Sequence, residues 1–216
     1  IAKYGTDIFR LYLMFGFSYT EGGPWNDEGI KAVSRFADRV EKIVLKQNSN
    51  ASGGIEDEKE LNFARNFAIK EIIADMDDFS FNTAIARLME YTNSLYKYCE
   101  SVSGGFFNQC VKDLILLIAP LAPHFAEELW QIKGGKFSVF DCGYPVCDEK
   151  ALIRDEIEIA VQINGKVRAR VKLQAGIKEK ELKETILSLN DISSYISGKE
   201  IKKFIVVPGK LVNIVL

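Results

Sequence analysis

The chain has 216 residues, enough for one large domain or two modest ones, and its 47% hydrophobic and 27% charged residues are typical of a globular protein. The formal net charge of −2 is unevenly divided: residues 1–152 hold 16 basic and 22 acidic side chains, a net −6, whereas residues 153–216 hold 12 and 8, a net +4. An acidic body with a basic end indicates contact with nucleic acid or a membrane surface. The longest apolar run is far shorter than the roughly 20 residues of a membrane span, and we expect no membrane partner.

The first residues lack a basic stretch, an apolar core and a cleavage site, so we expect no secretory signal. It begins with Ile1 instead of Met, so we expect a piece of a longer protein. The four cysteines show no CxxC spacing and His124 is the only histidine, which argues against a zinc site. Free thiols without a secretion signal favour a cytoplasmic protein.

Apolar residues at helical spacing predict five or six amphipathic helices in residues 1–147. The expected helices are 7–15, 27–46, 57–76, 82–103, 107–119 and 123–130. Thr6 and Asn26 are predicted N-caps, and Asp57 with Glu60 three residues later resembles a capping box. Short loops between such helices predict a bundle.

The pattern changes from a helical to a strand period after Pro145. Strands are expected at 157–163, 167–173, 204–207 and 211–215, with a helix at 178–189. These elements predict a small four-stranded α+β domain at 156–216, joined to the bundle by a linker at 148–155.

The Asn164-Gly165 pair predicts a hairpin turn between the first two strands. A two-residue loop would place cations on the apolar face, because it pairs Val161 with Arg168. A three-residue loop, 163–165, pairs Val161 with Val167 instead. We therefore expect a type I turn with Gly165 left-handed in a bulge.

Several kinds of chemistry lack a sequence signal. Neither a phosphate-binding GxxxxGK[ST] loop nor a GxGxxG turn after a strand is present. His124 fits a locally packed histidine at a helix start better than a general acid or base. Asp75, Asp77 and Asp78 fit a solvated helix end better than a metal site.

The second predicted strand carries the clearest chemical pattern. Lys166, Arg168, Arg170 and Lys172 alternate with apolar residues, so they are expected to point the same way over about 20 Å. Such a row can meet successive phosphates without reading bases. A solvated outer face protected by edge lysines explains the same pattern equally well. Further positive charge comes from residues near the last two strands: Lys199, Lys202, Lys203 and Lys210.

Several strings of residues resemble one known family. They are KYGTDIFRLY at 3–12, WNDEGI at 25–30, FNTAI at 81–85, LAPHFAEELW at 121–130, VQINGKVR at 161–168 and VPGKLVN at 207–213. The helical strings resemble class I aminoacyl-tRNA synthetases in general, including the valyl, isoleucyl and methionyl types. The last two are similar to the C-terminal domain of the bacterial-type leucyl-tRNA synthetases.

This resemblance implies a helical anticodon-binding domain at 1–147 and a C-terminal domain at 156–216 that contacts the outer corner of the tRNA. The expected partners are tRNA(Leu) and a catalytic domain of the same polypeptide, in a monomer. The HIGH and KMSKS signatures are absent. We therefore expect no catalytic residue and no cofactor in this chain, with ATP and magnesium implied only for the full enzyme. The expected tRNA-binding residues are Lys166, Arg168, Arg170, Lys199, Lys203 and Lys210.

A free-standing RNA-binding or scaffold module is the alternative from another class of protein. An upstream reading frame that carries the two signatures would favour the synthetase, and a start codon near Ile1 would favour the module.

Overall fold

The computed structural model describes residues 1–17, 22–153, 156–174, 177, 179–189, 192, 195–196, 201–207 and 210–216. The chain divides into two compact units, residues 1–152 and residues 153–216. Each unit has its own buried apolar cluster.

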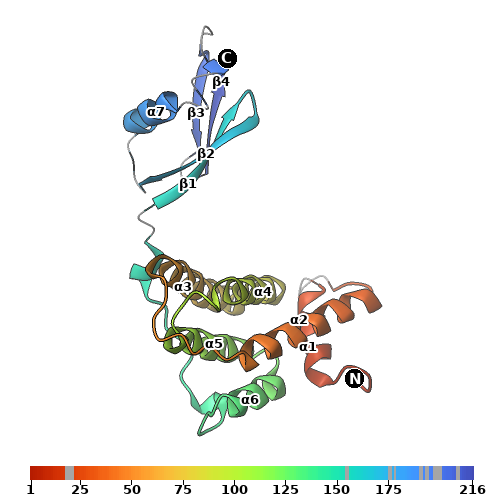
Figure 1. Ribbon diagram of the computed structural model, residues 1–216. Coiled ribbons are helices and arrows are strands. Elements are labelled where there is room, and N and C mark those ends of the chain that lie inside the picture. The colour runs from red at the N-terminus through yellow and green to blue at the C-terminus, as the bar shows by residue number, and fades with distance from the viewer. Residues whose placement is uncertain are drawn as a thin grey trace. The chain divides into compact units, whose positions relative to one another are not determined.

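The first unit is the predicted helical bundle. Its helices are α1 (Thr6–Phe15), α2 (Asp27–Leu45), α3 (Ile55–Asp77), α4 (Phe81–Tyr98), α5 (Gly104–Ile118) and α6 (Pro123–Ile132), followed by the short turns η1 (Val139–Asp141) and η2 (Glu149–Leu152). Figure 1 shows α3, α4 and α5 side by side, with α6 next to α5. No helix in the described residues is both long and apolar enough to cross a membrane.

Helix α2 shows why these segments become helices. Asn26 caps it as predicted: its side-chain oxygen accepts hydrogen bonds from the backbone N–H of Glu28 at 2.8 Å and of Gly29 at 3.4 Å. The residues expected to face inward are all buried; they are Ile30, Val33, Phe36, Ala37, Val40 and Val44. Burial of one apolar stripe therefore holds the helix in the bundle.

Several predicted helix bounds are wrong. Helix α4 ends at Tyr98 instead of 103, and α5 begins at Gly104 instead of 107. The starts of α1 and α3 also differ from the prediction. Helix α1 begins at Thr6 itself, and α3 begins at Ile55, and neither has a side-chain cap. At α3 the first-turn carboxylate of Glu58 instead accepts hydrogen bonds from the backbone N–H of Ser103 at 2.9 Å and from its hydroxyl. A tertiary contact therefore takes the place of the local capping box.

The end of the first unit lies against α3. The backbone N–H of Asp148 donates to the side-chain oxygen of Asn66 at 2.7 Å, and Glu149 forms an ion pair with Lys70 at 3.1 Å. Residues 148–152, which belong to the predicted linker, are thus attached to the bundle.

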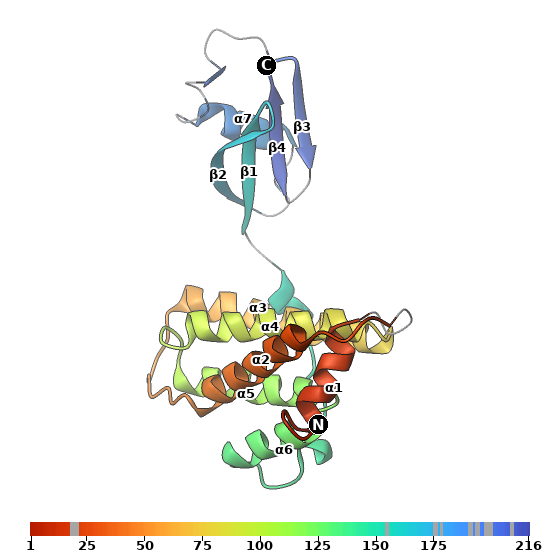
Figure 2. The same cartoon turned by 90° about the vertical axis from the view of Figure 1, so that its right-hand side faces the viewer.

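The second unit is an α+β domain, as predicted. Its strands are β1 (Glu156–Ile163), β2 (Lys166–Gln174), β3 (Lys203–Val207) and β4 (Leu211–Val215), in the order β2-β1-β4-β3. Strand β1 is antiparallel to β2 and parallel to β4, and β3 is antiparallel to β4. Figure 2 shows this order and α7 (Glu179–Ser188) against one face. That face is apolar and forms one buried cluster with α7, which includes Ile159, Val161, Ile163, Val212 and Ile214 of the sheet and Leu182 and Ile186 of α7. The predicted Pro208-Gly209 turn lies outside the described residues.

The β1–β2 turn differs from the prediction. Asn164 and Gly165 both have positive φ, 49° and 79°, and Ile163 pairs with Lys166, which is a two-residue type I′ hairpin. Gly165 is left-handed as expected, but the three-residue loop is wrong. Asn-Gly suits the type I′ turn because both of its residues tolerate positive φ.

A bulge further along β2 restores the apolar register. Val161 pairs with Ala169 and Gln162 with Val167, so Arg168 is the extra residue. The expected pairing of Val161 with Val167 is therefore wrong, although apolar side chains still meet apolar side chains on the covered face. The two-residue turn alone would pair Val161 with Arg168. The extra residue at the bulge shifts the register of β2 by one, so that Val161 pairs with Ala169 instead.

The buried thiol of Cys110 gives a first testable prediction. Burial raises the pKa of Cys110 to about 12, whereas the pKa of a thiol in an unfolded chain is about 8.5. At pH 8.5 the folded thiol should resist iodoacetamide, as measured by peptide mass spectrometry after pulse labelling. The thiol's contribution to stability should be complete below about pH 8.5 and should fall as the pH rises toward 12. Labelling as fast in the folded protein as in urea would contradict this.

Candidate nucleic-acid interface

The tip of the β1–β2 hairpin is held firmly against β4. The Asn213 side-chain oxygen accepts a hydrogen bond from the backbone N–H of Gly165 at 3.1 Å, and the Asn164 side-chain oxygen accepts one from the backbone N–H of Leu216 at 3.0 Å. The backbone N–H of Asn164 donates to the carbonyl of Ile214 at 2.9 Å. Cations that follow the turn therefore start from a fixed backbone.

The predicted tRNA-binding cations are exposed wherever the structure describes them. They are Lys166, Arg168, Arg170, Lys203 and Lys210. Lys199 lies outside the described residues, and for Lys172 only the backbone pairing with Glu158 is described.

The bulge separates this row onto two faces, so the expectation that all its cations point the same way is wrong. Cross-strand partners share a face of a sheet. Lys166 is paired with Ile163, which is buried toward α7, whereas Arg170 is paired with Ala160 on the opposite face. Lys203 is paired with Val215, which lies on the same face as Ala160 by register. Arg170 and Lys203 thus belong to the face opposite α7, which we call the outer face.

Arg168 is held by an aromatic residue that the sequence patterns did not single out. Its guanidinium carbon lies 4.6 Å from the centre of the Tyr195 ring, and its Nη1 donates to the Tyr195 hydroxyl at 3.5 Å. Tyr195 is partly exposed. This cation–π contact fixes the position of the guanidinium while leaving it exposed. The available signal in the sequence was an aromatic residue, Tyr195, four residues before Lys199.

The outer face also carries exposed apolar side chains. By register this face includes Val167, Ile205 and Val207, and each of them is exposed. Exposed apolar residues between cations can contact sugars and unstacked bases while the cations meet phosphates.

Lys166, Lys203 and Lys210 have no ion pair with a carboxylate in the described part of the chain. Their charge is therefore available to a polyanion.

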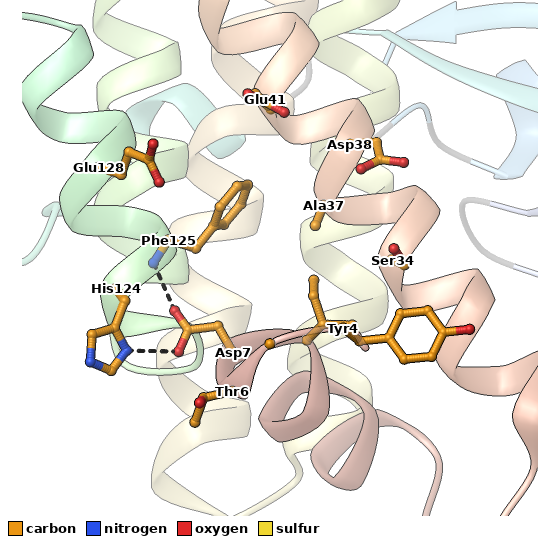
Figure 3. A pocket seen from close by; sticks show the side chains of 12 residues that line it. Tyr4, Thr6, Asp7, Ser34, Ala37, Asp38, Glu41, His124, Phe125 and Glu128 are labelled. Carbon is orange, nitrogen blue, oxygen red and sulfur yellow. Dashed lines mark hydrogen bonds and ion pairs between the residues drawn. The ribbon is translucent and has the colours of Figure 1, made fainter. Parts of the chain in front are cut away.

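A pocket of about 480 Å³ lies between α1, α2 and α6 of the bundle. Figure 3 shows the Asp7 carboxylate between the ring of His124 and the backbone nitrogen of Phe125. The other charged residues that line the pocket are Asp38, Glu41 and Glu128. Such an acidic lining repels phosphates, so the pocket is not part of the candidate interface.

His124 takes part in a helix cap. Its Nδ1 lies 3.0 Å from Asp7 Oδ1, and the backbone N–H of Phe125 donates to Asp7 Oδ2 at 2.7 Å. Asp7 therefore caps the N-terminus of α6 from another helix, where a carboxylate also meets the positive end of the helix dipole. The His124 side chain is itself 83% exposed. His124 therefore lies at a helix start as expected, but it is not locally packed: its partner is 117 residues away in the sequence.

Replacing Asp7 by alanine should lower the free energy of unfolding of the bundle by about 1–2 kcal/mol, because the first turn of α6 loses its cap. Asp7→Asn keeps an acceptor for Phe125 and should cost less. Both tryptophans, Trp25 and Trp130, lie in the first unit, so urea titration followed by tryptophan fluorescence reports on this unit alone. Equal losses for the two variants would show that the cap is not the cause.

The acidic group at the end of α3 is explained by helix pairing. Arg87 donates to Asp75 at 2.7 Å and also lies 3.0 Å from Glu71. Asp77 and Asp78 are exposed at the end of the helix, as expected. Within the described residues, no group of three or more His, Cys, Asp or Glu side chains is placed to hold a metal ion.

More than half of the chain matches one family of known proteins. Residues 58–184 match the family described as the anticodon-binding domain of tRNA ligase. Because this match covers more than half of the chain, the chain belongs to that family.

Two relatives that match the whole chain are leucine–tRNA ligases. The chain is 50% identical over 225 residues to the leucine–tRNA ligase of Clostridium tetani and 51% identical over 226 residues to that of Caldanaerobacter subterraneus subsp. tengcongensis. Each match covers all of this chain and 28% of the relative, so the chain spans little more than a quarter of these proteins. It also resembles the agnB2 LeuRS of Agrobacterium radiobacter K84, solved as a ternary complex with tRNA and LeuAMS. That likeness has a TM-score of 0.78 and 29% identity, covering 99% of this chain and 28% of the other.

Proposed function

We propose that this chain is the tRNA-holding part of a leucine–tRNA ligase and that it positions tRNA(Leu) for leucylation by a catalytic domain elsewhere in the same polypeptide. The observation that carries the proposal is the set of exposed cations of the second unit, with Arg168 held on Tyr195 and Arg170 and Lys203 on the outer face. The similarity to leucine–tRNA ligases along the whole chain supports leucine as the amino acid.

The contribution of these residues is positioning. Lysine and arginine side chains hold phosphates and fix the orientation of the nucleic acid without reading its bases. A folded tRNA is rigid and L-shaped, so holding its outer corner restricts where its acceptor end can be. That restriction raises the effective concentration of the acceptor end at a distant active site.

The chemistry of leucylation is assigned to the rest of the polypeptide. The pocket of the bundle does not suit ATP, because the carboxylates of Asp38, Glu41 and Glu128 that line it repel phosphates. Among the described residues, no group of three or more His, Cys, Asp or Glu side chains is placed to hold a metal ion. We expect the isolated chain to form no leucyl-adenylate. We also expect the whole protein to be cytoplasmic and monomeric.

Binding of a tRNA(Leu) transcript to the 216-residue chain at increasing salt tests the proposal. The logarithm of the association constant should fall linearly with the logarithm of salt, with a slope of about 0.7–0.9 for each phosphate contact. An absence of binding at low salt would refute the proposal. Pyrophosphate exchange with leucine and ATP by this chain alone would refute the assignment of catalysis to another domain.

A further inference from the structure

The segment that ends the first unit is attached to a buried amide on α3. The Asn66 side chain has no exposed surface. Its oxygen accepts a hydrogen bond from the backbone N–H of Asp148 at 2.7 Å, and the Asn66 backbone carbonyl accepts one from the Cys147 thiol at 3.5 Å. The side-chain nitrogen donates to the carbonyl and to the side-chain oxygen of Asn62, at 2.9 and 3.0 Å. Asn66 therefore joins α3 to a segment 82 residues further along the chain.

The packing of α3 in the bundle does not explain an asparagine at this position. The other buried side chains of α3 are apolar; they are Leu61, Ala68, Ile69 and Ile72. Asparagine is a weaker helix former than alanine or leucine, and a buried amide costs free energy unless it is hydrogen-bonded. Among the described residues, the partner of the Asn66 side-chain oxygen is the N–H of Asp148. The amide at this position therefore serves to hold residue 148.

A second contact holds the same segment one turn further along α3. Lys70 follows Asn66 by four residues and shares its side of the helix. It forms an ion pair with Glu149 at 3.1 Å, and the hydrogen bond and charge of Glu149 raise the pKa of Lys70. Both side chains are exposed, so this pair contributes little by itself. We call the contacts of Asn66 and Lys70 with Asp148 and Glu149 the Asn66 latch.

The latch sets how many residues separate the bundle from the second unit. Turn η2 ends at Leu152 and β1 begins at Glu156. An extended chain spans at most about 3.6 Å per residue, so β1 can begin no further than about 14 Å from Leu152. Without the latch, the last residue packed on the bundle is Cys147, and the limit becomes about 32 Å. The volume open to the start of β1 then grows about ten-fold, because volume rises with the cube of the reach.

We propose that Asn66 is a positioning residue for tRNA binding by the second unit. By fixing the start of the linker, it raises the effective concentration of the cations of the second unit at a tRNA that the first unit already holds. This inference rests on the proposed function, because it requires both units to bind the same tRNA. Asn66 acts without touching the RNA, since its side chain is buried.

The exposed Lys150 allows a direct test of the latch by limited trypsin digestion. Asn66→Ala removes the acceptor of the bond to residue 148, and Asp148→Pro removes the donor, because proline has no backbone N–H. Each should speed cleavage after Lys150 by about five-fold or more, since cleavage follows the population of released chain. Asp148→Ala is the matched control: it loses the same charge but keeps the N–H, so it should be cut more slowly than Asp148→Pro. Cleavage as slow in both latch variants as in the unchanged chain would overturn the proposal.

Binding of a tRNA(Leu) transcript to the 216-residue chain tests the positioning role. Asn66→Ala should weaken binding by about three- to ten-fold, where the upper limit is the growth in accessible volume. Its salt slope should stay unchanged, because no charge is lost. Asp148→Pro should bind more weakly than Asp148→Ala by a similar factor. Asn62→Ala leaves the carbonyl of residue 62 as an acceptor for Asn66 and should bind as the unchanged chain does.

A double-mutant cycle separates positioning from a general loss of stability. In the Arg168→Glu/Arg170→Glu background, Asn66→Ala should have no further effect, because the linker matters only while the second unit binds RNA. A structural defect in the bundle would weaken binding by the same factor in both backgrounds, and that result would overturn the proposal. Titration at high protein concentration gives the fraction of each variant that binds, so unfolded protein is not counted as weak binding.

The same measurements distinguish failure of this inference from failure of the proposed function. If Arg168→Glu/Arg170→Glu weakens binding while Asn66→Ala and Asp148→Pro match their controls, the latch does not position the second unit and the proposed function stands. If Arg168→Glu/Arg170→Glu binds tRNA as tightly as the unchanged chain, the proposed function fails and this inference fails with it.

Discussion

Replacing Arg65 by alanine should lower the free energy of unfolding of the bundle by about 3–5 kcal/mol. Arg65 on α3 forms an ion pair with Asp113 on α5, whose side chain is only 3% exposed. Gln109 donates a second hydrogen bond to the same carboxylate at 3.1 Å. Without the guanidinium, the Asp113 charge would be left buried with one neutral donor. This loss can be measured by urea titration followed by tryptophan fluorescence, because both tryptophans lie in this unit.

Replacing the acidic partner of this ion pair should lower the free energy of unfolding less than Arg65→Ala does, and this variant is the control. Asp113→Asn removes the buried charge and leaves Arg65, which is 21% exposed, able to reach water. Partial burial acts to lower the pKa of Arg65, but the hydrogen bond and charge of Asp113 outweigh it and raise the pKa. The double variant Arg65→Met/Asp113→Leu should recover most of the stability, because an apolar pair needs no compensating charge. A double variant as unstable as Arg65→Ala would show that packing alone causes the loss.

The helices of the bundle could be predicted because their signals are local. Apolar spacing in α2 placed the buried residues, and Asn26 placed its start, since both act within one or two turns. The starts of α1 and α3 could not be predicted in the same way. Glu58 is held by Ser103, 45 residues away, and Asp7 caps a helix that begins 116 residues later. Contacts of this kind depend on the packed structure.

The hairpin shows how a correct constraint can lead to a wrong geometry. The sequence requires apolar residues of β1 to face apolar residues of β2, and beyond the pair at the turn, Ile163 with Lys166, they do. A bulge at any residue of β2 could bring the apolar residues of the two strands opposite each other, and the sequence of the turn does not indicate at which residue the bulge lies. Because the bulge falls at Arg168, it also decides which face each cation occupies. The exposure of the candidate cations was thus predictable, but their division between faces and the stacking of Arg168 on Tyr195 were not.

Reversing the charge of both arginines, Arg168→Glu/Arg170→Glu, should weaken tRNA(Leu) binding by about a hundred-fold. Hydrogen bonds to charged groups contribute about 1.5–3 kcal/mol each, which is roughly ten-fold or more per arginine. The salt slope should also fall by about 1.4–1.8. Dissociation constants at several salt concentrations, measured by fluorescence anisotropy of a labelled transcript, provide both quantities.

The register of the sheet supplies matched controls for this variant. Lys183→Glu on α7 makes the same kind of charge change in the same unit, and Lys183 lies 5.6 Å from the Phe204 ring, a residue that packs with the covered face. Lys166→Glu changes a cation that register places on the side of Ile163. If the outer face holds the RNA, both should weaken binding less than Arg170→Glu alone, after correction for net charge. Equal losses for Lys183→Glu and Arg170→Glu would mean that tRNA responds only to the total charge of the unit, which would contradict a specific outer-face contact.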